Sequence, residues 1–246
     1  MVGRFVETLE LYGRLSDADR AAVAALPAAS RRFEAGEDIV SEGDAPSQCR
    51  LLLSGLAFRH KTLRDGRRQI MSFHVPGEIC DMEGLLLAMD HSVSALSRVE
   101  VSFIPHTAIE ALLDSHPQVA KALWRAELVE NAVAREWMVG MGRRSAYARI
   151  AHLFCEMYAR LRAVGLVEGA RCWFPITQTH LSDALGLSVV HTNRVLQTLR
   201  GEGLLSFRGG QLIVHDWPGL KAAGEFDPSY LHLKAGALHD GHRMHE

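Results

Sequence analysis

The chain has 246 residues, of which 48% are hydrophobic and 23% charged, and its formal net charge is −2. This length can bury a substantial core and is typical of two domains rather than one. No apolar run approaches the length of a membrane span and residues 1–7 lack the apolar core of a signal peptide, so we expect a soluble, cytoplasmic protein with no membrane partner.

Charge is distributed unevenly along the chain. Residues 1–142 carry 15 Lys and Arg against 20 Asp and Glu, residues 143–215 carry 9 against 4, and residues 216–246 carry 3 against 5. The positive excess therefore falls within a single segment. A local basic excess supplies the charge that phosphate binding needs, although solvated basic faces are also common.

Neither the cysteines nor the histidines form a pattern typical of a chemical site. The cysteines are Cys49, Cys80, Cys155 and Cys172. Because they are scattered, they argue against a disulfide framework, a zinc site and a four-cysteine iron–sulfur cluster. We expect reduced, buried thiols, with a redox sensor at Cys80 as the alternative. The tail histidines, His239, His242 and His245, are most simply part of a frayed terminus. With no phosphate-cradling glycine loop, nucleophile elbow or metal-ligand spacing, we predict no catalytic residues, no metal site and no enzyme.

The first half of the chain changes from helical to β-type patterning. Ser16-Asp17-Ala18-Asp19 is typical of a capping box that opens a helix, which Pro27 terminates. Between residues 32 and 105, short apolar runs such as residues 50–53 and 69–75 alternate with glycine-containing turns. The turn glycines are Gly36, Gly43, Gly55, Gly66 and Gly77. Turns at such regular intervals predict a β-roll or barrel.

Residues 106–165 are almost entirely compatible with helix. Pro117 suits a helix start, and an apolar stripe then recurs over several turns at Val119, Leu123, Ala126, Val129, Val133 and Trp137. Because this stripe is longer than a small domain needs for itself, we predict a helix pair between the subunits of a homodimer, with packing on its own domain as the alternative. The paired glycines in residues 140–144 predict a hinge, after which the helix resumes at Ala146.

Residues 177–200 have the pattern of a helix-turn-helix. Thr177 suits an N-cap, Gly186 a left-handed turn and Ser188 a second N-cap. In the second helix, helical spacing predicts an inward face of Thr192, Val195, Leu196 and Leu199. The alternative is an ordinary helical hairpin. Two short apolar runs around Gly209-Gly210 then predict a β-hairpin that forms a wing with Arg208 at its tip, and Asp216-Trp217-Pro218 predicts the start of a last short helix.

The order of β-roll, long helix, hinge, helix, helix-turn-helix and wing resembles the CRP/FNR family of bacterial transcription regulators. The resemblance covers nearly the whole chain, and its most specific parts are Pro76-Gly77-Glu78 with Gly84-Leu85, Ala148-Arg149-Ile150-Ala151, and the spacing of Thr177, Leu181, Gly186 and Arg194. It implies an α+β fold with a jelly-roll sensor domain like that of cyclic-nucleotide-binding proteins (residues 1–116), a dimerisation helix and hinge (residues 117–142), and a winged helix-turn-helix domain with a C-terminal tail (residues 143–246). It further implies a homodimer that binds double-stranded DNA at palindromic promoter sites, and RNA polymerase as a partner if the protein is an activator.

The residues that hold cyclic nucleotides in this family are replaced here. Cyclic-nucleotide binders carry a second Gly-Glu, whose glutamate holds the ribose, and a later Arg-Ser or Arg-Thr, whose arginine holds the cyclic phosphate; these positions correspond to Asp81-Met82 and His91-Ser92. Methionine cannot accept the ribose hydrogen bond, and a histidine ring cannot replace a bidentate arginine. We therefore expect no cyclic AMP. Because the family's clustered iron–sulfur cysteines are absent and His74 is a lone strand histidine, we also expect no iron–sulfur cluster and no haem. The candidate pocket for an unidentified effector is Glu78, Asp81, Met82, Glu83, Gly84, His91 and Ser92.

The resemblance also implies which residues contact DNA. The family's recognition helix commonly directs an Arg, a Glu and an Arg toward base edges, and these positions correspond to Val189, Val190 and Arg194. Valines can pack on thymine methyl groups, whereas Arg194 can read guanine. The predicted base-reading residues are Val189, Val190, His191, Asn193, Arg194 and Gln197. The predicted phosphate contacts are Thr177, Gln178, Thr179, Ser188 and Arg208.

Three functions compete at this point. A DNA-binding transcription regulator is favoured because the helix-turn-helix, the wing, the apolar stripe and the basic excess agree with one another. A module that binds a cyclic nucleotide or another small molecule and acts on protein partners is the second hypothesis, and it predicts no salt-sensitive DNA binding. An enzyme is the third. The effector, the operator and the choice between activation and repression are left open.

Overall fold

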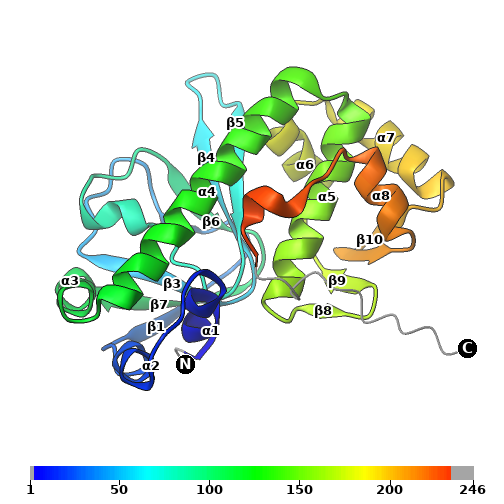
Figure 1. Ribbon diagram of the computed structural model, residues 1–246. Coiled ribbons are helices and arrows are strands. Elements are labelled where there is room, and N and C mark those ends of the chain that lie inside the picture. Colours follow the sequence, from blue (N-terminus) through cyan, green and yellow to red (C-terminus); the bar gives the residue numbers. More distant parts are fainter. Residues whose placement is uncertain (1–2, 234–246) are drawn as a thin grey trace, which may run out of the picture.

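The computed structural model describes residues 3–233 and places a β-roll on one side of the long helix α4 (Pro117–Arg143) and a second, largely helical domain on the other (Figure 1). Residues 1–2 and 234–246 lie outside the described residues, and with them the three tail histidines. Within the described part of the chain, no helix is both long and apolar enough to cross a membrane.

Two short helices precede the roll. The sequence pattern does not indicate α1 (Gly3–Tyr12), whose first turn carries no acidic residue, but α1 buries Phe5 and Leu9 against the roll-side core. The helix α2 (Asp17–Ala24) begins with the predicted capping box, because the Ser16 hydroxyl accepts from the Asp19 amide and the Asp19 carboxylate accepts from the Ser16 amide. The capping prediction is therefore confirmed.

The roll consists of two antiparallel sheets with strand orders β1-β7-β3 and β2-β6-β4-β5. Its strands are β1 (Ala29–Phe33), β2 (Asp38–Val40), β3 (Gln48–Ser54), β4 (Ala57–Thr62), β5 (Arg68–His74), β6 (Ser92–Ala95) and β7 (Val99–Pro105). A short 3-10 helix, η1 (Met82–Leu85), lies between β5 and β6. All five predicted turn glycines have a positive φ, between 77° and 99°, which side chains disfavour. The β-roll and its turns are therefore confirmed.

Helices α3 (His106–Ser115), α4 and α5 (Ala146–Ala163) form the middle of the chain, and α4 begins at Pro117 as predicted. The glycines of the predicted hinge at residues 140–144 do not break the helix, because Gly140 and Gly142 remain helical. The break falls at Arg144, whose φ of −83° and ψ of 148° are extended. Ser145 then caps α5 by accepting from the Ala148 amide, so a strong N-cap rather than weak glycine propensity sets the break.

The apolar stripe of α4 packs against its own chain. Ala126 is half-buried, and the other members of the stripe, Val119, Leu123, Val129, Val133 and Trp137, are buried. The first part of the stripe joins a core with α1 and α3, whereas its last part joins the core of the C-terminal domain. Our assignment of this stripe to a subunit interface is therefore wrong. Its length reflects a single helix that serves two cores in succession.

The C-terminal domain contains the predicted helix-turn-helix, α6 (Gln178–Leu185) and α7 (Val189–Gly201), and the predicted wing, β10 (Leu205–Arg208) and β11 (Gln211–Val214). The wing belongs to a sheet of order β10-β11-β9-β8. The other two strands of this sheet, β8 (Val167–Glu168) and β9 (Arg171–Trp173), are too short to show an alternating pattern in the sequence. Asp216 caps α8 (Trp217–Ala223) as predicted, and η2 (Pro228–Leu231) ends the described chain.

The roll also packs directly against the helix-turn-helix. Phe73 of β5 lies 6.0 Å from Trp137 of α4 and 5.4 Å from Phe174, measured between ring centroids. The Arg68 guanidinium lies 2.9 Å from the Asp183 carboxylate of α6. Apolar and ionic contacts thus fix α6 against the roll of the same chain.

Candidate DNA-binding surface

Side chains cap both helices of the helix-turn-helix. The Thr177 hydroxyl accepts from the His180 amide at 3.1 Å, and His180 Nδ1 accepts from the Thr177 amide at 3.3 Å, which closes a capping box at the start of α6. Gly186 ends α6 with a φ of 62°, and the Ser188 hydroxyl accepts from the His191 amide at 3.3 Å. All three predicted turn and cap residues therefore do what the sequence indicates.

The inner face of α7 holds the helix against its domain. The predicted inward residues are all buried, namely Thr192, Val195, Leu196 and Leu199. The Thr192 and Ser182 hydroxyl oxygens lie 3.2 Å apart and join α7 to α6. A buried hydrogen bond between two helices fixes their relative position, because either hydroxyl left alone would be unsatisfied.

The outer face of α7 is open to solvent. All predicted base-reading residues are exposed, namely Val189, Val190, His191, Asn193, Arg194 and Gln197. Val190, Arg194 and Gln197 lie three or four residues apart and therefore share the outermost line of the helix. Val190 is 72% exposed, and its methyl groups suit contact with thymine methyl groups. A helix presented in this way fits the major groove of B-DNA.

A groove of about 530 Å³ separates α7 from the wing. Its walls include Thr177 and Gln178 from the start of α6, Asn193 and Arg200 from α7, and Arg208 from the wing. Helix N-terminal amides and guanidinium groups are the donors that phosphate oxygens prefer. The structure therefore brings three of the predicted phosphate residues together, and it places Asn193 at the flank of α7 rather than on its outermost line.

Arg200 is a residue of this surface that the sequence analysis missed. It follows Asn193 by seven residues, so two helical turns place both on the same flank, and this spacing is the signal that could have found it. The guanidinium of Arg200 donates to the Phe207 carbonyl at 3.2 Å, which ties it to the wing. Acidic groups nearby are engaged elsewhere, because Asp183 pairs with Arg68 and Glu202 accepts from the Tyr147 hydroxyl. Arg200 and Arg208 thus bring positive charge to the groove where phosphates would lie.

The predicted effector residues do not converge on a single site. Glu78 faces α5, where its carboxylate accepts from Arg160 at 3.0 and 3.1 Å. Asp81 is fully buried and pairs with Arg50 at 2.7 Å. Of the remaining residues, Met82 packs beside the α1 core, Gly84 lies against Pro46, and the Ser92 hydroxyl accepts from the Glu42 amide.

Glu83 and His91 do come together. His91 Nε2 lies 2.7 Å from Glu83 Oε1, and Arg59 Nη2 lies 3.2 Å from the same oxygen. Burial raises the pKa of Glu83, but the contacts from His91 and Arg59 outweigh burial and hold that pKa at about 2. Protein side chains therefore satisfy the charge of Glu83.

The cysteines show no environment that would activate them. All four are buried, and burial raises the pKa of each thiol, which keeps it protonated. Within residues 3–233, no group of three or more His, Cys, Asp and Glu side chains is placed to hold a metal ion.

Comparison with known proteins agrees with this arrangement. Residues 30–116 match the cyclic nucleotide-binding domain, and residues 148–223 match the Crp-like helix-turn-helix domain. The chain is 26% identical to the transcriptional activator protein FnrL of Cereibacter sphaeroides over 187 residues, and this alignment covers 75% of each chain. It is 29% identical over 188 residues to the nitrogen fixation regulation protein FixK of Bradyrhizobium diazoefficiens, which covers 75% of this chain and 77% of the relative.

A solved structure matches over a similar extent. FixK2 from Bradyrhizobium japonicum superimposes with a TM-score of 0.72 at 27% identity, which covers 80% of this chain and 98% of FixK2. The matched domains, the transcription regulators among its relatives and an exposed recognition helix beside a basic groove all agree with one another. The chain belongs to the CRP/FNR family and is a DNA-binding transcription regulator of α+β fold.

Proposed function

We propose that the protein acts as a homodimer on palindromic promoter DNA, and that the exposed face of α4 forms the subunit interface. This face lies opposite the buried stripe and carries Trp124, Leu128 and Met138, which are 70%, 54% and 69% exposed. With Asn131 and Arg135 between them, these residues alternate in spacings of four and three, which is the repeat of a two-stranded coiled coil. The exposed stripe on α4 is the observation that carries the proposal.

A second copy of the chain suits this face better than an unrelated partner. A repeat of three and four residues is self-complementary about a two-fold axis, so each residue meets its counterpart from the other subunit. Asn131 lies in the middle of the repeat, and a polar residue there favours one register at some cost in stability.

A two-fold dimer carries two copies of α7, and this supports recognition of a palindrome. Two recognition helices related by such an axis enter successive major grooves about one helical turn, roughly 34 Å, apart. We therefore propose half-sites at that spacing, each read by Arg194 on guanine and by Val190 on thymine methyl groups. The groove of Thr177, Gln178 and Arg208 would hold the flanking phosphates.

We propose activation of transcription as the outcome. The name of FnrL, a transcriptional activator protein, supports this direction. An activator at a promoter contacts RNA polymerase, so we propose the polymerase as a second partner besides DNA. We also propose that the protein acts in the cytoplasm.

We propose that the roll receives its signal without cyclic AMP. A cyclic phosphate at this position would meet the Glu83 carboxylate, which already contacts Arg59 and His91. The missing ribose acceptor at Met82 and the missing arginine at His91 each remove a charged hydrogen bond of about 1.5–3 kcal/mol. We also propose that the protein holds neither an iron–sulfur cluster nor haem. In support, the four cysteines lie in three separate core clusters.

Light scattering on purified protein tests the interface. Leu128→Glu combined with Met138→Glu places charge on the exposed face of α4 without touching a core, so we expect a monomer. Leu63→Glu is the matched control, because Leu63 is 54% exposed in the turn between β4 and β5, and this variant should remain a dimer. A monomeric wild type at micromolar concentration would refute the homodimer, whereas a dimeric double variant would refute only this face.

The salt dependence of binding to duplex DNA distinguishes the regulator from a module that acts on protein partners. We expect the affinity to fall steeply as salt rises, because phosphate contacts release counterions. Wild-type protein without such salt-sensitive binding would favour the module.

A further inference from the structure

A chain of polar side chains, buried except for the half-buried Tyr230, joins α4, α5 and η2. His152 Nδ1 lies 3.0 Å from the Gly224 carbonyl oxygen, and His152 Nε2 lies 3.0 Å from the Tyr230 hydroxyl. The Tyr230 hydroxyl in turn lies 2.8 Å from Glu156 Oε2. Trp137 of α4 donates its indole N–H to both Glu156 oxygens, at 3.2 and 3.1 Å. Glu156 is fully buried and His152 is 5% exposed, so these groups have little access to water.

Three contacts link Gly224 to His152, His152 to Tyr230, and Tyr230 to Glu156, and each of them needs one proton. A carbonyl only accepts, so the contact with Gly224 requires a proton on His152 Nδ1. Tyr230 has one hydroxyl proton, which can serve either His152 Nε2 or Glu156 but not both. The third contact therefore needs one more proton, either on His152 Nε2 or on the Glu156 carboxyl. The chain of contacts is complete only while this additional proton is bound.

We infer that these contacts form a joint between η2 and α5 that acts as a proton-sensitive switch. Loss of the additional proton leaves Tyr230 able to bind only one of His152 and Glu156, loosens η2 from α5 and lowers the affinity of the protein for DNA. Burial raises the pKa of Glu156 to about 7, against the opposing effects of Arg160, Tyr230 and Trp137. Burial lowers the pKa of His152. Glu156 is therefore the site of the proton, and small changes around neutral pH alter its occupancy.

The groups packed around Glu156 make its ionised form costly. Arg160 of α5 lies 3.8 Å from Glu156, but it already binds Glu78, which follows β5, and Glu130 of α4, each at 3.0 Å. Tyr12 of α1 faces the same charges. When Glu156 ionises, three carboxylates share one buried guanidinium, and like charges at such distances repel strongly in a medium of low polarity.

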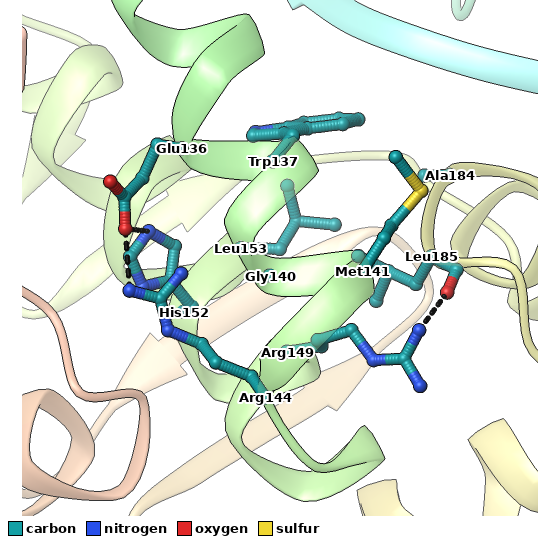
Figure 2. Close-up of a pocket in the computed structure, with 10 residues that line it drawn as sticks. All are labelled: Glu136, Trp137, Gly140, Met141, Arg144, Arg149, His152, Leu153, Ala184 and Leu185. Atoms are coloured by element: carbon teal, nitrogen blue, oxygen red, sulfur yellow. Dashed lines mark hydrogen bonds and ion pairs between the residues drawn. The ribbon is translucent and has the colours of Figure 1, made fainter.

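The groups around His152 complete the surroundings of the joint. The Glu136 carboxylate contacts both His152 and Arg144 (Figure 2), with His152 Nε2 4.0 Å from Glu136 Oε1. Glu225, which follows α8, also faces His152. Two carboxylates and one guanidinium thus leave one net negative charge around the His152 ring.

The joint lies on the helix that supports the DNA-binding surface. Arg149, one turn before His152 on α5, donates to the Leu185 carbonyl of α6 at 2.8 Å. Gly224 packs so closely on α5 that a Cβ there would lie 2.7 Å from the His152 backbone nitrogen. Separation of η2 from α5 therefore disturbs the same helix that positions α6, and through it α7.

The test compares full-length wild type with Glu156→Gln and with the matched control Glu168→Gln, which removes an exposed carboxylate of the same domain. Glutamine mimics the protonated carboxyl, because its amide donates to Tyr230 and its oxygen accepts from Trp137. Between about pH 6 and about pH 8, we expect the DNA affinity of wild type and Glu168→Gln to fall about fivefold more than that of Glu156→Gln. Histidines on the DNA-binding surface contribute equally to all three proteins and cancel in the comparison.

The indole N–H resonance of Trp137 gives a second readout that does not depend on DNA. It should titrate once around neutral pH in wild type and stay constant in Glu156→Gln. Tyr230→Phe serves if Glu156→Gln does not fold: it removes the middle of the chain, so its DNA affinity at about pH 6 should equal that of wild type at about pH 8. A wild-type Trp137 resonance without a titration, or an unchanged pH dependence of DNA binding in Glu156→Gln, would overturn the inference.

Discussion

Arg160→Met tests how strongly the roll, α4 and the DNA-binding domain depend on one buried cation. Arg160 is 6% exposed, and one of its nitrogens donates to both oxygens of Glu78 and to Glu130, all within 3.1 Å. Methionine keeps much of the length and volume of the side chain but removes the charge. The substitution therefore leaves two mostly buried carboxylates facing each other without a counterion.

Breaking a buried ion pair from one side costs about 3–5 kcal/mol, because the remaining charge stays desolvated. We expect the free energy of unfolding of Arg160→Met to fall by that amount, since the side chains of Glu78 and Glu130 are only 15% and 20% exposed. Adding Glu78→Gln removes one of the stranded charges and should restore a large part of the loss. The two changes are thus coupled rather than additive.

Urea denaturation followed by circular dichroism measures both effects. The midpoint should fall for Arg160→Met and recover in the Arg160→Met, Glu78→Gln double variant. A loss below about 1 kcal/mol in the single variant would refute the reasoning, because that is the range of a solvent-exposed pair.

Three further outcomes are expected. Gly140→Ala should raise the free energy of unfolding, measured by urea denaturation, by about 1 kcal/mol or more. Alanine favours helix, and the new methyl group would meet no atom closer than 3.6 Å. Gly142→Ala, at an exposed position, should gain only the stabilisation from helix propensity. Between about pH 4.5 and pH 2 the protein should lose stability, and Glu78→Gln should lose less. Burial raises the pKa of Glu78, but Arg160 outweighs burial and holds that pKa at about 2, below the ordinary 4.5. The stabilisation from Glu78 is therefore present above pH 4.5 and disappears as Glu78 is protonated. Titration calorimetry should find cyclic AMP bound at least about a hundredfold more weakly than by a relative that keeps both ligand residues, and micromolar binding would contradict this.

The helix-turn-helix and the roll turns could be predicted from the sequence because their signals are local. The caps at Thr177 and Ser188 and the left-handed turn at Gly186 each act within a few residues, and the structure contains all three. The same holds for the turn glycines of the roll, whose positive φ depends on the absence of a side chain rather than on distant contacts.

The subunit face of α4 could not be predicted in the same way. Periodicity shows that a helix has an apolar stripe, but it does not show what covers that stripe. The stripe with Val133 packs on its own chain, whereas the second, sparser repeat with Trp124 and Leu128 is exposed. The larger stripe dominates the apolar pattern of α4, so periodicity did not reveal the smaller exposed repeat. α4 packs its larger stripe into two cores in succession and leaves its opposite face exposed.

The buried joint also escapes sequence analysis. Glu156 and Arg160 read as ordinary charged residues of an amphipathic helix, and Glu78 reads as part of a turn motif. Arg160 and Glu78 are 82 residues apart, and Tyr230 is 74 residues from Glu156. Only the packing of the roll against α5, and of η2 against α5, brings these groups together.

A binding selection from random duplex DNA, with wild type, Arg194→Ala and Arg208→Ala, tests most directly whether α7 reads the operator. Wild type should select a palindrome with one strongly required G·C pair in each half-site. Arg194→Ala should lose that requirement at a cost of about 1–3 kcal/mol on the selected site, while Arg208→Ala should weaken binding to selected and random DNA alike. If Arg194→Ala selects the same half-site with the same G·C requirement, α7 does not read DNA as assigned here.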